Sequence, residues 1–152
     1  VGHIFGGYGY DVCLFHVIRG IGSSVPDAPD HMVLPEYVES ARLKMTQLFE
    51  TLRHKLITAG FKPEHITEKI TVLSGAIPSA RAGVMTYVGD TVMLARTGVY
   101  SRAGAIVSEA EEEGYGTIVV GRKGLSAVKE FFMGRVSSKV IHGDRKFTVW
   151  VI

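Results

Sequence analysis

A chain of 152 residues with 46% apolar and 21% charged residues has the size and composition of one soluble globular domain. Its formal net charge of +2 is too small to indicate a nucleic-acid partner, and no basic block with interleaved aromatic residues is present. No apolar run approaches the roughly 20 residues that cross a bilayer, and no signal peptide is visible, so we expect no membrane partner. The single cysteine, Cys13, lies in an apolar run, which fits a buried thiol in a reducing cytoplasm.

The elements from residue 1 to residue 73 begin with a short helix end at 1–5. The run DVCLFHVI at 11–18 lacks polar alternation, as is typical of a strand buried on both faces. A loop rich in Gly, Ser and Pro follows at 19–34, and residues 65–73 predict a second strand.

The clearest helix is predicted at 35–59, with Pro35 in its first turn and Gly60 just past its end. Its apolar residues recur at steps of three and four: Val38, Ala41, Met45, Leu48, Leu52 and Leu56. Such a stripe predicts packing on a sheet, and a partner-binding face is the alternative.

In the C-terminal third, Ser101 is a predicted N-cap for a helix that ends at Glu113. Strands are predicted at 115–120 and 146–152, and helical stretches at 125–133 and 135–142. Strands that alternate with helices predict a doubly wound α/β sheet.

Residues 72–96 interrupt this alternation. In one interpretation VLSGA is a strand and Ser79 caps a helix that carries Val84, Tyr87, Val88, Val92 and Ala95. The alternative is a β-hairpin, VMTYV-GD-TVMLA, which turns at Gly89-Asp90. We favour the helix because the spacing fits a period of 3.6 better than 2 and an N-cap is present.

Three glycines follow the apolar run Thr117–Val120 with the spacing G-x2-G-x9-G: Gly121, Gly124 and Gly134. A strand that leads through glycines into a helix start can bind phosphate, because the backbone can approach an anion and the helix start offers unpaired N–H groups. The alternative is that the glycines only make turns.

The stretch from Ser101 to Ile152, SRAGAIVSEAEEEGYGTIVVGRKGLSAVKEFFMGRVSSKVIHGDRKFTVWVI, resembles the C-terminal half of a universal stress protein domain. Nucleotide-binding members of that family carry Ser or Thr directly after the third glycine. Here Arg135 stands at that place and the first hydroxyl is Ser137. Arginine can also hold phosphate.

This resemblance implies a Rossmann-like fold with a mostly parallel five-stranded sheet and helices on both faces. The chain then reads as one such domain at 1–152, with the family's first strand–helix unit missing or relocated to 72–96. The chain either carries a relocated or duplicated strand–helix unit, or joins pieces of a larger or tandem protein. The family places an Asp after its first strand, and the matching stretch Ser74-Gly75-Ala76 has no acid.

By the same resemblance, the expected ligand is ATP or AMP, with or without Mg²⁺. The main chain of Val17 would meet adenine, Val120–Gly124 would face ribose and phosphates, and the N–H groups of Gly134–Ser137 would hold the outer phosphates. The cationic side chains of Arg122, Lys123 and Arg135 are either part of this site or belong to a solvated surface around it. The expected nucleotide-binding residues are Val17, Val120, Gly121, Arg122, Lys123, Gly124, Gly134, Arg135, Val136 and Ser137.

No catalytic set stands out in the sequence. The six histidines are scattered without metal-ligand spacing, and neither a G-x-S-x-G elbow nor a G-x4-G-K-[ST] loop is present. We therefore expect at most slow ATP hydrolysis in a site that mainly positions phosphates.

The terminal run Phe147–Ile152 predicts an apolar edge strand, which invites pairing with another chain. Universal stress proteins dimerise through their last strand, so the resemblance also implies a homodimer. The sequence thus predicts a cytoplasmic, homodimeric, nucleotide-binding module of the stress response. The alternative is a family member that binds no nucleotide and acts through dimerisation alone.

Overall fold

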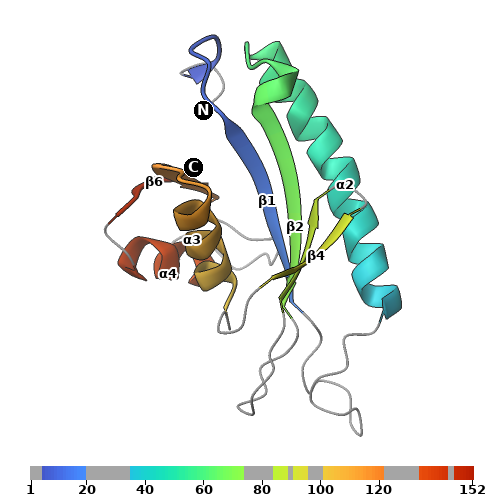
Figure 1. Cartoon of the computed structure of the whole chain (residues 1–152). Coiled ribbons are helices and arrows are strands. Elements are labelled where there is room, and N and C mark those ends of the chain that lie inside the picture. The colour runs from blue at the N-terminus through green and yellow to red at the C-terminus, as the bar shows by residue number, and fades with distance from the viewer. Residues whose placement is uncertain are drawn as a thin grey trace, which may run out of the picture. The chain divides into compact units, whose positions relative to one another are not determined.

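The structure is a computed structural model that describes residues 5–19, 35–73, 84–88, 91–95, 101–121, 134–143 and 146–152 (Figure 1). At 19, 35, 84–88 and 91–95 it describes the backbone alone. The chain divides into two compact units, Val1–Gly98 (unit 1) and Val99–Ile152 (unit 2). Each unit combines helices with parallel strands, so the predicted α/β class is confirmed.

Unit 1 is built on a strand–helix–strand crossover. Strand β1 (Val12–Arg19) is followed by helix α2 (Pro35–Thr58), a short 3-10 helix η1 (Pro63–His65) and strand β2 (Ile66–Leu73). The two strands are parallel, in a register that runs from Val12 opposite Ile66 to Arg19 opposite Leu73. Figure 1 shows α2 lying along both strands. The predictions of these strands and this helix are confirmed.

The core of unit 1 lies between α2 and the two strands. Its buried residues are Ile18, Val38, Phe49, Ile70 and Val72, and Leu14, Ala41, Met45 and Leu52 pack against them. The predicted stripe was wrong at one position, because Leu48 is 45% exposed whereas Phe49 is 5% exposed. One residue turns a helix by about 100°, which places Phe49, and not Leu48, in line with Val38.

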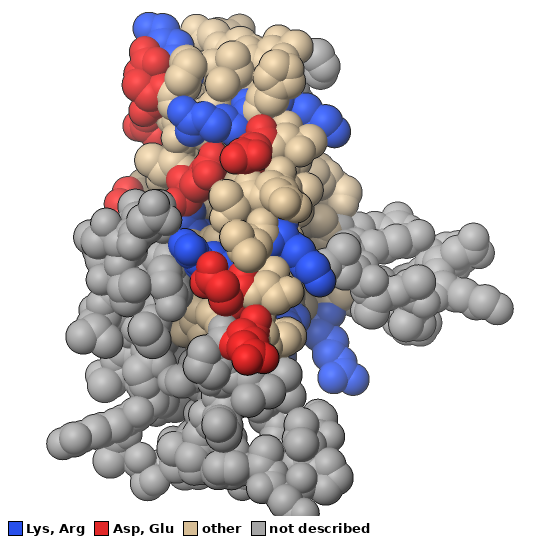
Figure 2. Space-filling view, turned by 90° about the vertical axis from the view of Figure 1, so that its right-hand side faces the viewer, with Lys and Arg blue, Asp and Glu red and all other residues tan. Residues whose placement is uncertain are grey.

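The outer face of α2 carries charges of both signs among uncharged residues. Figure 2 shows this side of the molecule, where Lys and Arg side chains alternate with Asp and Glu. An exposed ion pair joins Arg42 to Glu39 at 3.2 Å, one turn apart. Apolar residues lie on both faces of α2, because Val38 and Phe49 are buried against the strands whereas Leu43 is 55% exposed.

Helix α2 ends in a Schellman motif. Gly60 has φ of +99°, its N–H donates to Ile57 O, and the N–H of Phe61 donates to Leu56 O. Phe61 is 4% exposed, which supplies the apolar contact of the motif. The backbone of Gly7 donates to Gly60 O at 2.9 Å, so the segment before β1 is attached to the end of α2.

Residues 84–88 and 91–95 form two antiparallel strands, so the favoured helix was wrong and the strands of the alternative hairpin are confirmed. The predicted turn at Gly89-Asp90 lies outside the described residues. Strands β3 (Val84–Val88) and β4 (Thr91–Ala95) are antiparallel, with Val88 opposite Thr91 across the predicted turn. Strand β3 also pairs antiparallel with β2. β-branched residues favour strands, and these strands extend an existing sheet, whereas a short isolated helix is only marginally stable in water. The helix of the predicted relocated strand–helix unit is therefore not formed at 84–88 and 91–95.

Unit 2 begins with helix α3 (Arg102–Glu112), and Ser101 caps it by accepting from Gly104 N–H at 3.0 Å. The helix ends at Gly114, which has φ of +73°, and Tyr115 N–H donates to Ala110 O. The elements that follow are strand β5 (Thr117–Val120), helix α4 (Arg135–Gly143) and strand β6 (Thr148–Val151).

Strands β5 and β6 are parallel, with Ile118 opposite Val149. Both helices of unit 2 pack on the same face of this pair, around buried Ala103, Ala110, Ile118 and Val140. Every predicted strand and helix that falls on described residues of unit 2 is confirmed within a few positions, and the stretch at 125–133 lies outside them.

The described strands form two sheets and not the single five-stranded sheet that we predicted. One sheet has the order β1-β2-β3-β4 and is mixed, and the other has the order β5-β6. The hairpin causes part of this difference, because β3 occupies the edge of β2 with an antiparallel strand. None of the described helices is long and apolar enough to cross a membrane. That 1–152 form a single domain stays a prediction.

Candidate phosphate-binding site

The site is built where β5 ends and α4 begins. Val120 is the last residue of β5, and exposed Gly121 follows it directly. Gly134 precedes α4, and its carbonyl accepts from Ser138 N–H at 2.9 Å, which is the first turn of the helix. The two glycines are far apart in sequence, and the fold brings the ends of their segments together.

A buried hydrogen bond makes this connection. The Oγ of Ser137 donates to the carbonyl oxygen of Gly121 at 2.7 Å, and Ser137 is 6% exposed. Val120 and Val136 pack against the core of unit 2 on either side of it. Their side chains are partly buried in this core, so the polar groups that these two residues can offer a ligand are those of the main chain.

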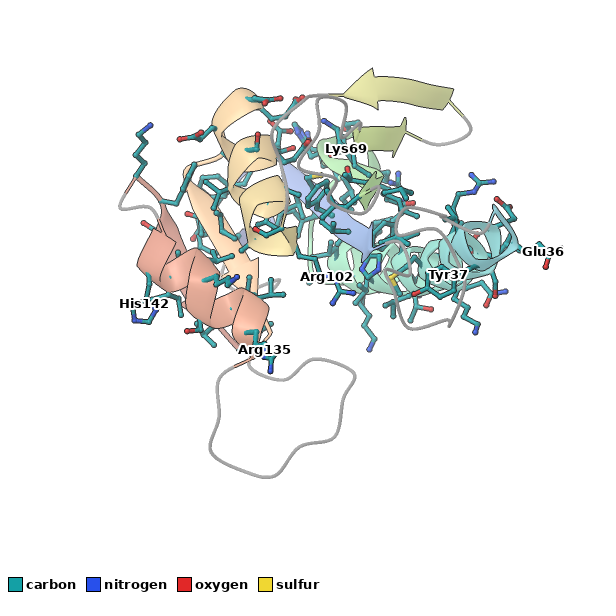
Figure 3. The ribbon with its side chains drawn as sticks, turned by 90° about the horizontal axis from the view of Figure 1, so that it is seen from below. Glu36, Tyr37, Lys69, Arg102, Arg135 and His142 are labelled. Carbon is teal, nitrogen blue, oxygen red and sulfur yellow. The ribbon has the colours of Figure 1, made fainter. Side chains whose placement is uncertain are left out.

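The start of α4 suits an anion. The N–H groups of 135–137 come before Ser138 N–H, the first main-chain donor that bonds within the helix, and the positive end of the helix dipole lies there. The first turn of α4 holds no acidic residue that would neutralise this end. Arg135 is exposed at the first position, and Figure 3 shows its side chain extending from that end of the helix.

The opposite end of α4 is closed by its own residues. His142, labelled at the far end of α4 in Figure 3, holds its Nδ1 2.7 Å from Ser138 O. A basic residue there complements the negative end of the helix dipole. The helix therefore leaves its N-terminal end as the one suited to a charged ligand.

Hydrogen bonds between β5 and β6 and an ion pair to α3 fix the strand that leads to Gly121. Thr148 N–H donates to Gly116 O and Ile152 N–H donates to Val120 O, each at 3.0 Å, so both ends of β5 are paired with β6. The Nζ of Lys146 lies 3.0 Å from a carboxylate oxygen of Glu111, which connects the start of β6 to α3. Gly121 consequently follows a strand that is fixed at each end.

The structure brings together six of the predicted site residues: Val120, Gly121, Gly134, Arg135, Val136 and Ser137. Arg122, Lys123 and Gly124 lie outside the described residues. Val17 lies in β1 of unit 1, opposite Thr71 and 6% exposed, and its contact with adenine stays a prediction. The sequence interpretation assigned Ser137 a main-chain role and missed the hydrogen bond of its hydroxyl. The available signal was that a serine stands three residues into the predicted helix.

Chemically, this arrangement offers hydrogen-bond donors and positive charge. The groups that it presents are main-chain N–H groups and one guanidinium, both of which favour phosphate oxygens. Among the described residues, no group of three or more His, Cys, Asp or Glu side chains could hold a metal ion.

Comparison with known families covers this same region. The model of the universal stress protein family matches residues 95–146, about a third of the chain. This segment is similar to the universal stress protein family. The match confirms the resemblance, and it starts after the hairpin and spans α3, β5 and α4 with both ends of the glycine loop. The chain matched no curated protein and no solved structure.

Proposed function

We propose that this protein is a cytoplasmic nucleotide-binding module of the universal stress protein type, with ATP or AMP as ligand. The observation that carries the proposal is the Ser137–Gly121 hydrogen bond within the family segment. It places the glycine after β5 beside the first turn of α4, as a phosphate site between a strand and a helix requires.

In this proposal the N–H groups of Arg135, Val136 and Ser137 donate to phosphate oxygens. The Arg135 guanidinium takes the place of the hydroxyl that the family's nucleotide-binding members carry, and it adds a charged donor. Gly121 leaves room for the ligand beside the strand end. The site binds and orients phosphates, and any hydrolysis is slow because none of these groups can activate water.

The test is calorimetric titration of the nucleotide-stripped protein with ATP and Mg²⁺, and with AMP, after assay of what the protein carries from the cell. Saturable binding, or a co-purified adenine nucleotide, supports the proposal. Absence of both contradicts it.

Variants of α4 sharpen this titration. Arg135→Ala is expected to lower affinity about tenfold, since a charge-assisted hydrogen bond is lost. Arg135→Ser restores the family's hydroxyl at this position and should bind at least as well as Arg135→Ala. Lys139→Ala is the matched control, because Lys139 is also exposed on α4 but lies one turn beyond the helix start. Equal losses in both alanine variants would indicate a general charge effect.

The second candidate is an interaction module that acts through a homodimer, and the edge position of β6 favours it. Among the described strands, β6 pairs with β5 alone. The N–H groups of Thr148 and Ile152 face β5, so by the alternation of a strand those of Val149 and Val151 face the other edge. Such an edge can pair with the same strand of a second copy.

Proline substitutions test the two edges of β6 independently. Val151→Pro removes an outward N–H, which a strand edge tolerates, so it should leave the unfolding midpoint almost unchanged. Sedimentation should then show a monomer. Thr148→Pro removes the bond to Gly116 and should weaken unit 2 itself. A Val151→Pro protein that remains a dimer would exclude pairing through this edge.

A further inference from the structure

Ser137 stands out among the polar side chains of the described residues. Only Thr71 and Ser137 are both polar and buried there, and Ser137 lies at the candidate site. Its hydroxyl bonds across 16 positions of sequence to a main-chain oxygen, and not to its own helix. Serine near a helix start usually bonds to the nearby backbone, so this long-range partner calls for an explanation.

The bond holds Gly121, which follows β5, next to the first turn of α4. Bringing two segments of a chain together costs conformational entropy, and a bond already formed between them removes part of that cost before a ligand arrives. Because a peptide unit is planar, holding the carbonyl of Gly121 also fixes the orientation of the peptide group that opens the loop. Donors that point to a phosphate gain affinity when they are oriented in advance.

The hydroxyl itself is poorly placed to be a ligand group. Its one proton is donated to Gly121 O, and the side chain is 6% exposed. A phosphate oxygen needs a donor, and this hydroxyl has no second proton to give. The contribution of Ser137 to a bound nucleotide therefore comes from its main-chain N–H and from the shape that its side chain imposes.

We propose that Ser137 is the positioning residue of the phosphate loop: its hydroxyl holds Gly121 against the first turn of α4 and so pre-forms the nucleotide site. This inference rests on the proposed function. It assigns the side chain to loop geometry and leaves direct contact with phosphate to the main chain and Arg135.

The test compares three variants in calorimetric titration with ATP and Mg²⁺. Ser137→Ala removes only the hydroxyl and should lower affinity about five- to tenfold, which is the effect of one net hydrogen bond. Ser138→Ala makes the same change one residue further along α4, where no bond to the loop exists, and should stay within about twofold. Val140→Ala weakens the core of unit 2 at its most buried side chain and should leave affinity unchanged.

Hydrogen exchange of the ligand-free proteins gives the second measurement. Ser137→Ala should speed exchange at Gly121 and at 134–136 while protection in α3 stays as it was. Ser138→Ala should change neither region.

The outcomes are distinct. If the unchanged protein binds no adenine nucleotide, the proposed function fails and the positioning role falls with it. If it binds and Ser137→Ala binds equally well, the positioning role alone is overturned. If Val140→Ala loses as much affinity as Ser137→Ala, the effect is one of stability, which also overturns it.

Discussion

Each of the two units contains the same kind of helix-to-strand turn, but the chain continues differently after the strand that follows it. In each, an amphipathic helix ends in a Schellman motif with glycine followed by an aromatic residue: Gly60-Phe61 after α2 and Gly114-Tyr115 after α3. In each, a strand then begins that pairs in parallel. The same local chemistry therefore builds the same helix-to-strand turn twice.

The difference lies beyond the strand. In unit 1, β2 is extended sideways by the antiparallel hairpin β3–β4. In unit 2, β5 leads to Gly121, which is bonded to the first turn of α4. Among the described residues, this bond between a helix start and a strand end lies in unit 2, so the comparison teaches that the candidate phosphate site depends on how the chain continues and not on the parallel strands themselves.

The largest effect is expected in the core of unit 1. Phe49→Ala should lower the free energy of unfolding by about 3–5 kcal/mol, because it leaves a cavity between α2 and the strands. Leu48→Ala, its neighbour on the exposed face, should cost less than about 1 kcal/mol. Urea denaturation measures both. Equal costs would contradict the burial of Phe49 and the exposure of Leu48, and the reverse order would show that the two positions have the opposite orientation.

The same Phe49→Ala protein tests how far the two units unfold together. Hydrogen exchange that becomes faster at 12–19 and 66–73, with β5 still protected, would show two independent units. Equal acceleration in β5 would support the single domain predicted from sequence.

A smaller loss is expected from Arg53, which joins α2 to the start of β2. Its guanidinium donates to Ile66 O at 2.9 Å and to Pro63 O at 2.8 Å, and Glu68 lies 3.8 Å away. Arg53→Ala should cost about 2 kcal/mol, since two carbonyls lose a charged donor at a partly exposed site. Arg42→Ala, which breaks an exposed pair one turn apart, should cost about 0.3 kcal/mol. If thermal melts show the same loss of stability in both variants, the contacts of Arg53 add nothing to the stability of the fold beyond an exposed ion pair.

The helix-to-strand turns of the two units can be compared through substitutions of their glycines, Gly60 and Gly114. Both have positive φ, so alanine is strained at either position by about 1 kcal/mol. At Gly60 a Cβ would also lie 3.3 Å from backbone atoms of Gly6 and Gly7, whereas at Gly114 it would meet nothing within 4 Å. Gly60→Ala should therefore cost about 2 kcal/mol and Gly114→Ala about 1 kcal/mol. The reverse order in chemical denaturation would contradict the close approach at Gly60.

The smallest effect is expected at the surface of unit 2. Lys146→Ala breaks the exposed pair with Glu111 and should cost at most about 0.5 kcal/mol, and less in high salt. Melting in low and high salt measures it. A loss above 1 kcal/mol that persists in high salt would mean that this pair fixes β6 in place.

Local signals in the sequence determined most elements of this protein. Pro35 and Gly60 bracket α2, and Ser101 and Gly114 bracket α3, because caps and glycine stops act within a few residues. Unalternating apolar runs marked β1 and β5 for the same reason. The glycine spacing likewise located Gly121 and Gly134 at the candidate site.

Tertiary structure decided what depends on distant partners. The apolar residues at 84–95 suit a helix or a hairpin, and pairing with β2 selected the hairpin. The neighbours Leu48 and Phe49 are both apolar, and only the sheet beneath α2 shows which one is buried. The bond from Ser137 to Gly121 joins two elements across a loop, and local sequence carries no signal for a contact whose geometry is set by the packing of α4 on β5 and β6.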